Sequence, residues 1–217
     1  FASADSALTH WLQLDPEPTP QGLFLAGYVA FQQEDYPRAA ERVGRAMAGT
    51  VFVPATWVEV QAFALLRSGR GPEAEALLED RIGRYPNEAG WWRILARLAL
   101  DADRLEDAAV RMAVLDAAER LAPAESRRLA GLLAGTGQPE RGARLLAASF
   151  AIADPETVSA ADLMTLARLW IAAREWDEAV GGLEAAAGRP EAAEPLVVLG
   201  QTHLHWERYG AALEALQ

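Results

Sequence analysis

Apolar residues recur along most of the chain at intervals of three and four positions, which is the spacing of an amphipathic helix. Two stretches show it clearly: Trp92, Leu95, Ala96 and Ala99, and Leu163, Leu166, Ala167 and Trp170. Short polar or glycine-containing stretches separate such segments, and Gly69 and Gly137 take the same place in two of them. The segments that follow open with proline or acidic residues, which suit the N-terminal end of a helix dipole. The pattern therefore predicts an all-α chain of helix pairs joined by short turns.

The predicted helix pairs form a repeat. In every pair a small residue of the first helix is followed twelve positions later by a small residue of the second, and this occurs six times. The pairs are Gly27 and Ala39, Ala62 and Ala74, Ala96 and Ala108, Ala130 and Gly142, Ala167 and Ala179, and Gly200 and Ala212. Their first members are separated by 35, 34, 34, 37 and 33 residues. Since small side chains let two helix axes approach closely, a bulky residue at Ala108 or Ala179 is expected to overpack the crossing at a cost of about 1–3 kcal/mol.

The residues around these small pairs resemble the tetratricopeptide repeat. The third unit matches that pattern with Trp92, Leu95, Ala96, Ala108, Met112 and Pro123, and the sixth with Leu196, Leu199, Gly200, Tyr209, Ala212 and Leu216. The resemblance covers residues 20–217. It implies an all-α, right-handed superhelical solenoid of about six tetratricopeptide helix-turn-helix repeats. Gly142 departs from the pattern by replacing alanine, and extra residues near 152–158 predict a longer loop there.

Two segments are expected along the chain. Residues 1–19 predict a cap helix followed by a proline-rich linker, because alternate prolines cannot continue a helix. Residues 20–217 are expected to form the repeat array. Its repeats are predicted near 20–54, 55–88, 89–122, 123–159, 160–192 and 193–217, the last of them incomplete. Because solenoid ends need polar caps for solubility, the C-terminal end is expected to continue into further chain or to be covered by a partner or a second copy.

Charge and composition exclude several classes of function. The chain carries 20 basic residues, all of them arginine, against 31 acidic ones, so its net charge is −11. Nucleic-acid backbones and anionic membrane surfaces both bind net basic faces, and neither is an expected partner. No apolar run approaches the length of about 18 residues that a membrane-spanning helix needs. The absence of cysteine excludes disulfides, thiolate metal sites and cysteine nucleophiles.

The chemically active residues form no candidate catalytic, cofactor or metal site. His203 and His205 lie two positions apart and so point to different sides of one helix, and His203 replaces an aromatic residue of the repeat, which predicts a satisfied core histidine. Residues 135–137 form a turn without the lysine or the preceding strand of a phosphate-binding loop. Three tryptophans at packing positions are expected in the core, namely Trp92, Trp170 and Trp176. We therefore expect a protein that is not an enzyme and that binds neither cofactor nor metal.

The resemblance implies a concave groove lined by the first helices of the repeats. The groove positions of the first two repeats hold the apolar residues Phe24, Tyr28, Phe31, Phe63 and Leu66. Those of the third to fifth repeats hold Arg93, Arg97, Arg127, Arg128 and Arg168, against one acid, Asp101. We interpret the groove as taking apolar side chains in one half and carboxylates of an acidic partner in the other, a role for which the arginine fork is suited. The alternative is that the arginines are ordinary solvated surface and that residues 1–14 bury the aromatic residues.

These features favour a non-enzymatic protein–protein interaction scaffold that binds a peptide segment of a partner in its groove. Two alternatives stay open: an array that assembles through its exposed end repeats, and a helical domain of a larger protein. Short strings in residues 90–92, 173–179 and 199–201 resemble the tetratricopeptide proteins encoded beside TonB–ExbB–ExbD systems of Gram-negative bacteria. That resemblance implies a periplasmic accessory of a transport or envelope system. The sequence Ala2-Ser3-Ala4, which has the form of a signal-peptidase site, agrees with it.

Overall fold

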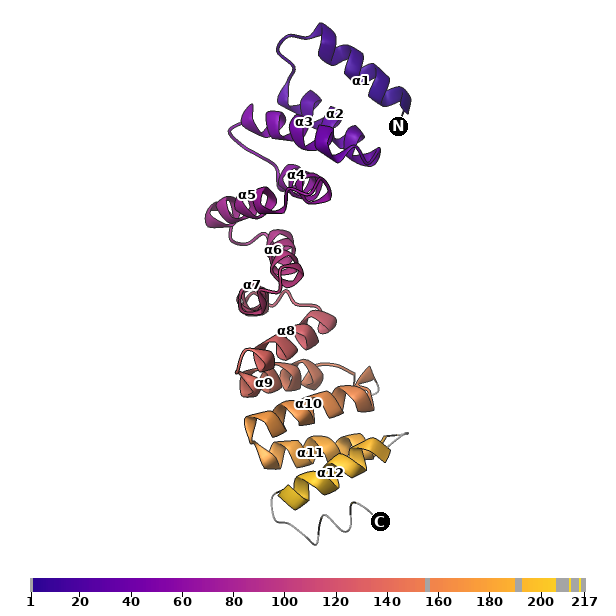
Figure 1. The fold of residues 1–217 in the computed structure, drawn as a ribbon, viewed down its shortest axis with the longest axis vertical. Coiled ribbons are helices and arrows are strands. Elements are labelled where there is room, and N and C mark those ends of the chain that lie inside the picture. Colours follow the sequence, from indigo (N-terminus) through magenta and orange to yellow (C-terminus); the bar gives the residue numbers. More distant parts are fainter. Residues whose placement is uncertain (1, 155–156, 190–192, 206–210, 212–214, 216–217) are drawn as a thin grey trace. The chain divides into compact units, whose positions relative to one another are not determined.

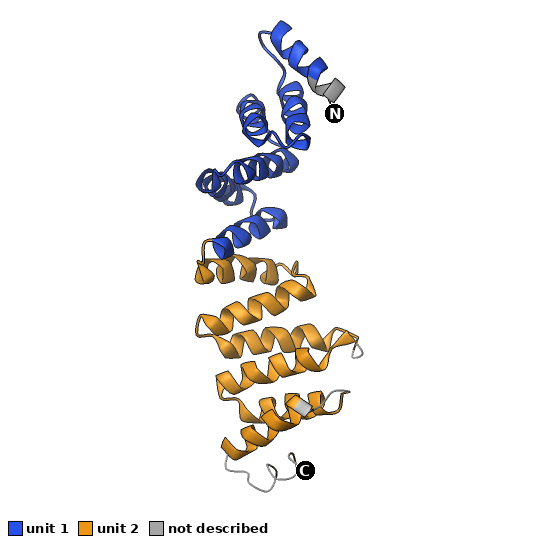
Figure 2. Cartoon of the chain, turned by 45° about the vertical axis from the view of Figure 1, so that its right-hand side comes forward, with its two compact units in different colours: residues 1–101 blue, residues 102–217 orange. Residues whose placement is uncertain are grey.

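The computed structural model describes residues 2–154, 157–189, 193–205, 211 and 215. Throughout these residues the regular structure is helical, with no strand. The chain divides into two compact units, unit 1 of residues 1–101 and unit 2 of residues 102–217 (Figure 2). The prediction of an all-α solenoid of paired helices is confirmed, and the handedness of its superhelix stays a prediction.

The helices alternate with short connections in both units (Figure 1). Unit 1 contains α1 (Ala2–Leu14), α2 (Pro20–Gln32), α3 (Tyr36–Ala48), α4 (Ala55–Arg67), α5 (Gly71–Arg84) and α6 (Ala89–Asp101). Unit 2 contains α7 (Leu105–Ala117), α8 (Pro123–Gly135), α9 (Pro139–Ala151), α10 (Ala160–Ala173), α11 (Trp176–Ala187) and α12 (Ala193–His205). The even-numbered helices are the first helices of the predicted pairs. The second helix predicted after α12, with Tyr209, Ala212 and Leu216, lies outside the described residues.

In the first and fourth repeats a small residue of the pair lies where the two packed helices cross. Ala130 on α8 is completely buried, and its carbonyl oxygen lies 2.5 Å from the place where a Cβ atom on Gly142 of α9 would stand. In the first repeat, a Cβ atom on Gly27 would stand 2.6 Å from a side-chain methyl of Val43. The departure of Gly142 from the alanine of the repeat pattern therefore has a physical reason, since α8 and α9 cross too closely for a methyl group.

The turn inside each of the first five pairs places one residue in the left-handed region of backbone conformation. These residues are Glu34 (φ 62°), Gly69 (φ 78°), Asp103 (φ 56°), Gly137 (φ 82°) and Arg174 (φ 63°). Each lies two positions before the first residue of the second helix. Glycine adopts this conformation without strain, whereas other L-residues lose about 1–2 kcal/mol there. The two turn glycines of the sequence thus occupy the position that needs them, and three repeats tolerate another residue.

Arg174→Gly is expected to raise the free energy of unfolding by about 0.5–1 kcal/mol, because relief of the left-handed strain exceeds the entropy that glycine gives to the unfolded chain. The reverse change in the same unit, Gly137→Ala, should lower it by a similar amount. Urea unfolding followed by circular dichroism measures both. Equal effects of the same sign would contradict the assignment of these turns.

Each unit has hydrophobic clusters of its own. In unit 1 one cluster joins α2 to α6 through Leu23, Val43, Val58, Leu78 and Trp91. In unit 2 one cluster surrounds Leu146, Leu169 and Trp170, and another surrounds Leu183.

The predicted core position is right for Trp170 and wrong for Trp92 and Trp176, which are only half-buried. The buried tryptophans of unit 1 are instead Trp57 and Trp91. The Trp92 indole N–H donates to the carbonyl oxygen of Pro86 at 2.8 Å.

Helix α1 packs on α2. The Trp11 ring covers Gly22 so closely that a Cβ atom there would stand 2.1 Å from a ring carbon. Arg42 of α3 is buried, and its guanidinium donates to the Ala26 carbonyl oxygen at 3.1 Å and to the Thr9 hydroxyl at 3.4 Å. The charged group thus links the first three helices.

Candidate functional site

Unit 1 exposes a group of aromatic side chains on its first helices, here called the aromatic patch: Phe24, Tyr28, Phe31 and Phe63. The Phe24 ring lies flat on Trp57, with 4.7 Å between centroids and 8° between planes, and Tyr28 stacks beside Phe24 at 6.1 Å. Tyr28 is 38% exposed and Phe63 is 44% exposed. The described residues of α1 therefore do not bury these two rings. The patch combines an anchored stack with solvent-accessible aromatic surface.

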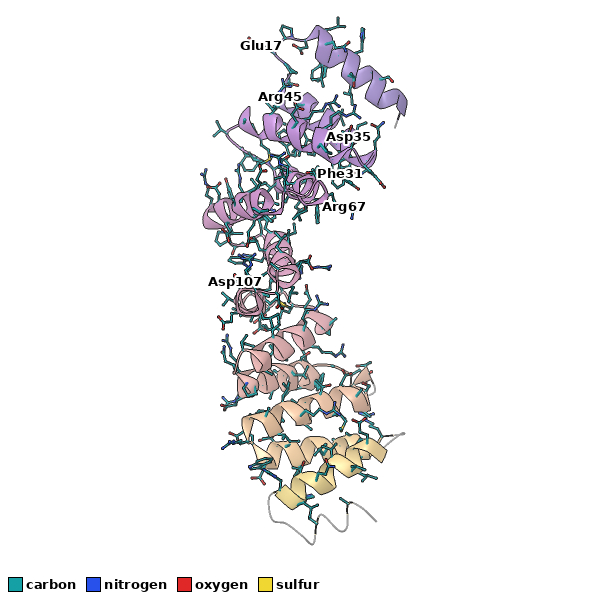
Figure 3. All side chains as sticks on the ribbon, in the orientation of Figure 1. Glu17, Phe31, Asp35, Arg45, Arg67 and Asp107 are labelled. Carbon is teal, nitrogen blue, oxygen red and sulfur yellow. The ribbon has the colours of Figure 1, made fainter. Side chains whose placement is uncertain are left out.

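Phe31 belongs to a second aromatic contact at the end of α2. The Phe31 ring contacts the Tyr36 ring edge to face, with 5.5 Å between their centroids. The Arg67 guanidinium lies over the Tyr36 ring, 5.3 Å from its centroid. Arg67 also donates to the Tyr36 hydroxyl at 3.4 Å, and this hydrogen bond raises the pKa of Arg67. Figure 3 labels Phe31 and Arg67, which lie on the same side of unit 1. The contacts hold Phe31 in place at the edge of the patch.

The predicted arginines of unit 1 are exposed on α6. Arg97 donates to Asp101 at 2.8 Å, one helical turn further along the same helix. Arg93 stands one turn before Arg97. On the neighbouring first helix, a carboxylate oxygen of Glu59 lies 2.8 Å from the place where a Cβ on Gly90 would stand. Acidic groups therefore share this part of unit 1 with the arginines.

In unit 2, two of the predicted arginines pair with carboxylates of the following first helix. Arg127 of α8 forms a two-point ion pair with Asp162 of α10, with Nε 2.7 Å from Oδ1 and Nη2 3.2 Å from Oδ2. The same carboxylate accepts from the Ser159 hydroxyl at 2.9 Å and caps the beginning of α10. Arg168 of α10 pairs with Glu194 of α12. Arg128 is exposed and has no carboxylate partner in the part of the chain that is described.

The charge of this surface differs from the sequence interpretation. In unit 1 the arginines share the first helices with Glu59 and Asp101, and in unit 2 two of them pair with Asp162 and Glu194. The sequence interpretation counted only Asp101. The spacing of 35 residues between Arg127 and Asp162, one repeat length, is the signal that was available in the sequence. Trp57, Tyr36 and Arg67 were also missed, since they lie outside the groove positions that the repeat pattern implies.

The other chemically active side chains are the histidines and the remaining carboxylates. No group of three or more His, Cys, Asp or Glu side chains within the described residues is arranged to hold a metal ion. His203 is buried, as predicted for a core histidine, but its Nδ1 has no hydrogen-bond partner among the described residues. His205 is exposed, and its ring lies 5.5 Å from that of Trp176. None of the helices searched in the described ranges has the length and apolar character needed to span a membrane.

Comparison with solved structures identifies the fold as that of tetratricopeptide-repeat proteins. YrrB, described as "a TPR protein with an unusual peptide-binding site", matches with a TM-score of 0.60 at 14% identity, over 94% of this chain and 100% of its own. A tetratricopeptide repeat protein from Parabacteroides merdae ATCC 43184 matches with a TM-score of 0.57 at 16% identity, over 99% and 83%. MamA from Desulfovibrio magneticus RS-1 matches with a TM-score of 0.52 at 16% identity, over 75% and 90%. Neither a protein-family model nor a curated protein matches the sequence.

Proposed function

We propose that the chain is a non-enzymatic protein–protein interaction scaffold that binds a peptide segment of a partner on its first helices. The observation that carries the proposal is the aromatic patch of unit 1. Phe24 is fixed by its stack on Trp57, and Tyr28 and Phe63 present exposed rings on α2 and α4. Aromatic residues held on one side and exposed on the other contribute a large share of binding energy at interfaces. The peptide-binding site named for YrrB, which has the same fold, supports the same function.

The arginines support a second, weaker contribution from acidic residues of the partner. A partner carboxylate would meet Arg128 directly, whereas at Arg97, Arg127 and Arg168 it would compete with Asp101, Asp162 and Glu194. Exchange of one exposed ion pair for another gains little free energy, and salt screens it. We therefore assign the affinity mainly to apolar side chains and a salt-sensitive share to the arginines.

Within this proposal, the resemblance to the TonB-associated proteins supports a periplasmic accessory role in a transport or envelope system. The −11 net charge agrees with a soluble partner rather than with nucleic acid.

Peptides selected on the wild-type chain from a random phage-displayed library are expected to lose at least about tenfold in affinity for the double variant Tyr28→Ser/Phe63→Ser. The reason is that the variant lacks both rings, so its complex with the peptide buries less aromatic surface. Isothermal titration calorimetry at two salt concentrations measures the loss and the share of the arginines.

The control is Phe52→Ser, which removes an aromatic ring that is 70% exposed in the loop between α3 and α4, outside the patch. It should leave the affinity unchanged. Failure to select any peptide, or equal binding to the double variant, would sink the proposal. Light scattering of the free chain in the same buffer separates peptide binding from self-assembly, which would appear as a mass that grows with concentration.

A further inference from the structure

A pocket of about 570 Å³ lies in unit 2 between the second helix α7 and the end of α8, beside the first turn of α9. Its size is within the range of small-ligand sites, about 300–1,000 Å³. The lining contains none of the groove residues predicted on the first helices. This pocket is therefore separate from the surface of the proposed function.

One wall of the pocket is an apolar strip along α7. Val110 of this strip is 65% exposed, and Val114, one helical turn further along, is half-buried. The buried Leu133 side chain of α8 lies in the same lining. The Thr136 hydroxyl donates to the Leu132 carbonyl oxygen at 2.9 Å, so this polar group of the lining already has a partner within the protein. The strip therefore offers apolar surface that a ligand can cover.

Two opposite charges in the lining have no ionic partner. Glu106 of α7 and Arg141 of α9 are both exposed, and neither forms an ion pair with the other or with any further described residue. The Arg141 guanidinium instead donates to the amide oxygen of Gln138 at 3.3 Å, and Gln138 lines the same pocket. Because both charged side chains are solvent-accessible, a ligand in the pocket can reach them.

The charges next to these two residues are paired locally. Arg104 donates to Asp107, the residue after Glu106, at 3.1 Å. Arg144 lies 2.5 Å from Glu140, the residue before Arg141. The pocket therefore presents one carboxylate and one guanidinium whose neighbours do not neutralise them.

Arg141 also occupies an unfavourable place in its helix. It lies in the first turn of α9, where the positive end of the helix dipole disfavours a cation. The residue that precedes this helix, Gln138, makes no side-chain cap hydrogen bond to the first-turn N–H groups. A bound anion beside Arg141 would offset both the guanidinium and the helix end.

We propose that this pocket binds an apolar zwitterion, which is either a free amino acid with an apolar side chain or a short apolar peptide. The carboxylate of the ligand accepts from the Arg141 guanidinium, and its ammonium group donates to the Glu106 carboxylate. Its apolar side chain packs on Val110 and Val114. An arginine fork suits a carboxylate. Each unpaired charge of the lining thus meets the opposite charge, and the apolar strip is removed from water.

The first experiment titrates L-leucine, leucyl-leucine and trileucine separately into the isotope-labelled chain. NMR follows the methyl groups of Val110 and Val114 and the Nε–H of Arg141. Saturable shifts of these signals are expected with at least one of the three zwitterions. The probe that binds most tightly identifies the source of the ligand, a free amino acid or a peptide of that length. Absence of saturation with all three overturns the proposal.

Modified forms of the tightest probe test its two charges and its side chain. The N-acetyl form lacks the ammonium group, the C-terminal amide lacks the carboxylate, and the corresponding glycine compound lacks the apolar side chains. Each should bind at least about fivefold more weakly, as expected for a hydrogen-bonded charge pair that water partly screens or for lost apolar contact. If any one of them binds as tightly as the parent probe, the proposed mode of binding is wrong.

Variants test the two charged residues of the pocket. Glu106→Gln and Arg141→Gln should each weaken the tightest probe at least about fivefold. The matched controls Asp107→Asn and Arg144→Gln remove the same charges from the same two helices, outside the lining, and should leave the affinity unchanged. A loss of the same size in the controls, or none in Glu106→Gln and Arg141→Gln, contradicts the site.

A last pair of measurements separates this inference from the proposed function. The double variant Tyr28→Ser/Phe63→Ser changes unit 1 only and should bind the zwitterion like the wild type. Arg141→Gln should still bind the peptides selected on the aromatic patch. Failure of the pocket and failure of the patch therefore give different results.

Discussion

Gly142→Ala is expected to lower the free energy of unfolding of unit 2 by about 1–3 kcal/mol, the usual cost of overpacking a close contact. Alanine is the better helix former by about 1 kcal/mol, so helix propensity alone predicts the opposite sign. The crossing of α8 and α9 decides the outcome. A Cβ atom on Gly142 would stand 2.5 Å from the Ala130 carbonyl oxygen, which is a backbone atom that cannot rotate away.

Gly131→Ala is the matched control. Gly131 is an exposed glycine of α8, and a Cβ atom built on it meets nothing within 4 Å. This change should therefore stabilise the chain by about 0.5–1 kcal/mol through helix propensity. Urea unfolding followed by circular dichroism measures both variants. A stabilising Gly142→Ala would show that the two helix axes lie further apart than the structure has them.

Leu146→Ala is expected to cost about 2–5 kcal/mol, the range for removing a buried leucine side chain. Leu146 is completely buried on α9, in a cluster with Leu166, Leu169 and Trp170 of α10 and Ala179 of α11. One side chain thus fills space between two repeats, and its loss leaves a cavity that both line. Hydrogen exchange read by mass spectrometry should show faster exchange in α8 to α11.

The control for this variant is Ile152→Ala in the same unit. Ile152 is 90% exposed just after α9, and its removal should change stability by less than about 0.5 kcal/mol. If the two variants cost the same, the cluster around Leu146 is not the core of this unit.

The helix pairs were predictable because the signal repeats. A small residue at the crossing, a proline or acid at the start of the second helix and a glycine in the turn each carry little information alone. Because these features recur in six repeats at the same spacing, together they predict the helix pairs. Recurrence does not help to predict the burial of a single residue. The pattern places Trp92 on the buried face of α6, but a rotation of one residue position buries the neighbouring Trp91 instead.

The candidate site was predictable only as a set of positions. All ten apolar and arginine residues predicted for the groove are half-buried or exposed, which their place on the first helices already implied. Their partners were not predictable, because an ion pair such as that of Arg127 and Asp162 depends on rotamers and on the spacing of neighbouring repeats. Gln61 shows the same limit for burial. A glutamine within a helix is typical of solvated surface, yet Gln61 is buried on α4 with its Nε2 atom beside Gly44 of α3.

The ion pairs between α8 and α10 and between α10 and α12 have a consequence for how unit 2 unfolds. In a one-dimensional array, stability divides into a term for each repeat and a coupling term between neighbours. Each of these ion pairs joins a residue of one repeat to a residue of the next. Their free energy therefore adds to the coupling term and not to the stability of a single repeat. High salt is therefore expected to weaken this coupling term by less than about 1 kcal/mol per pair, while the apolar contacts around Leu146 continue to couple the repeats.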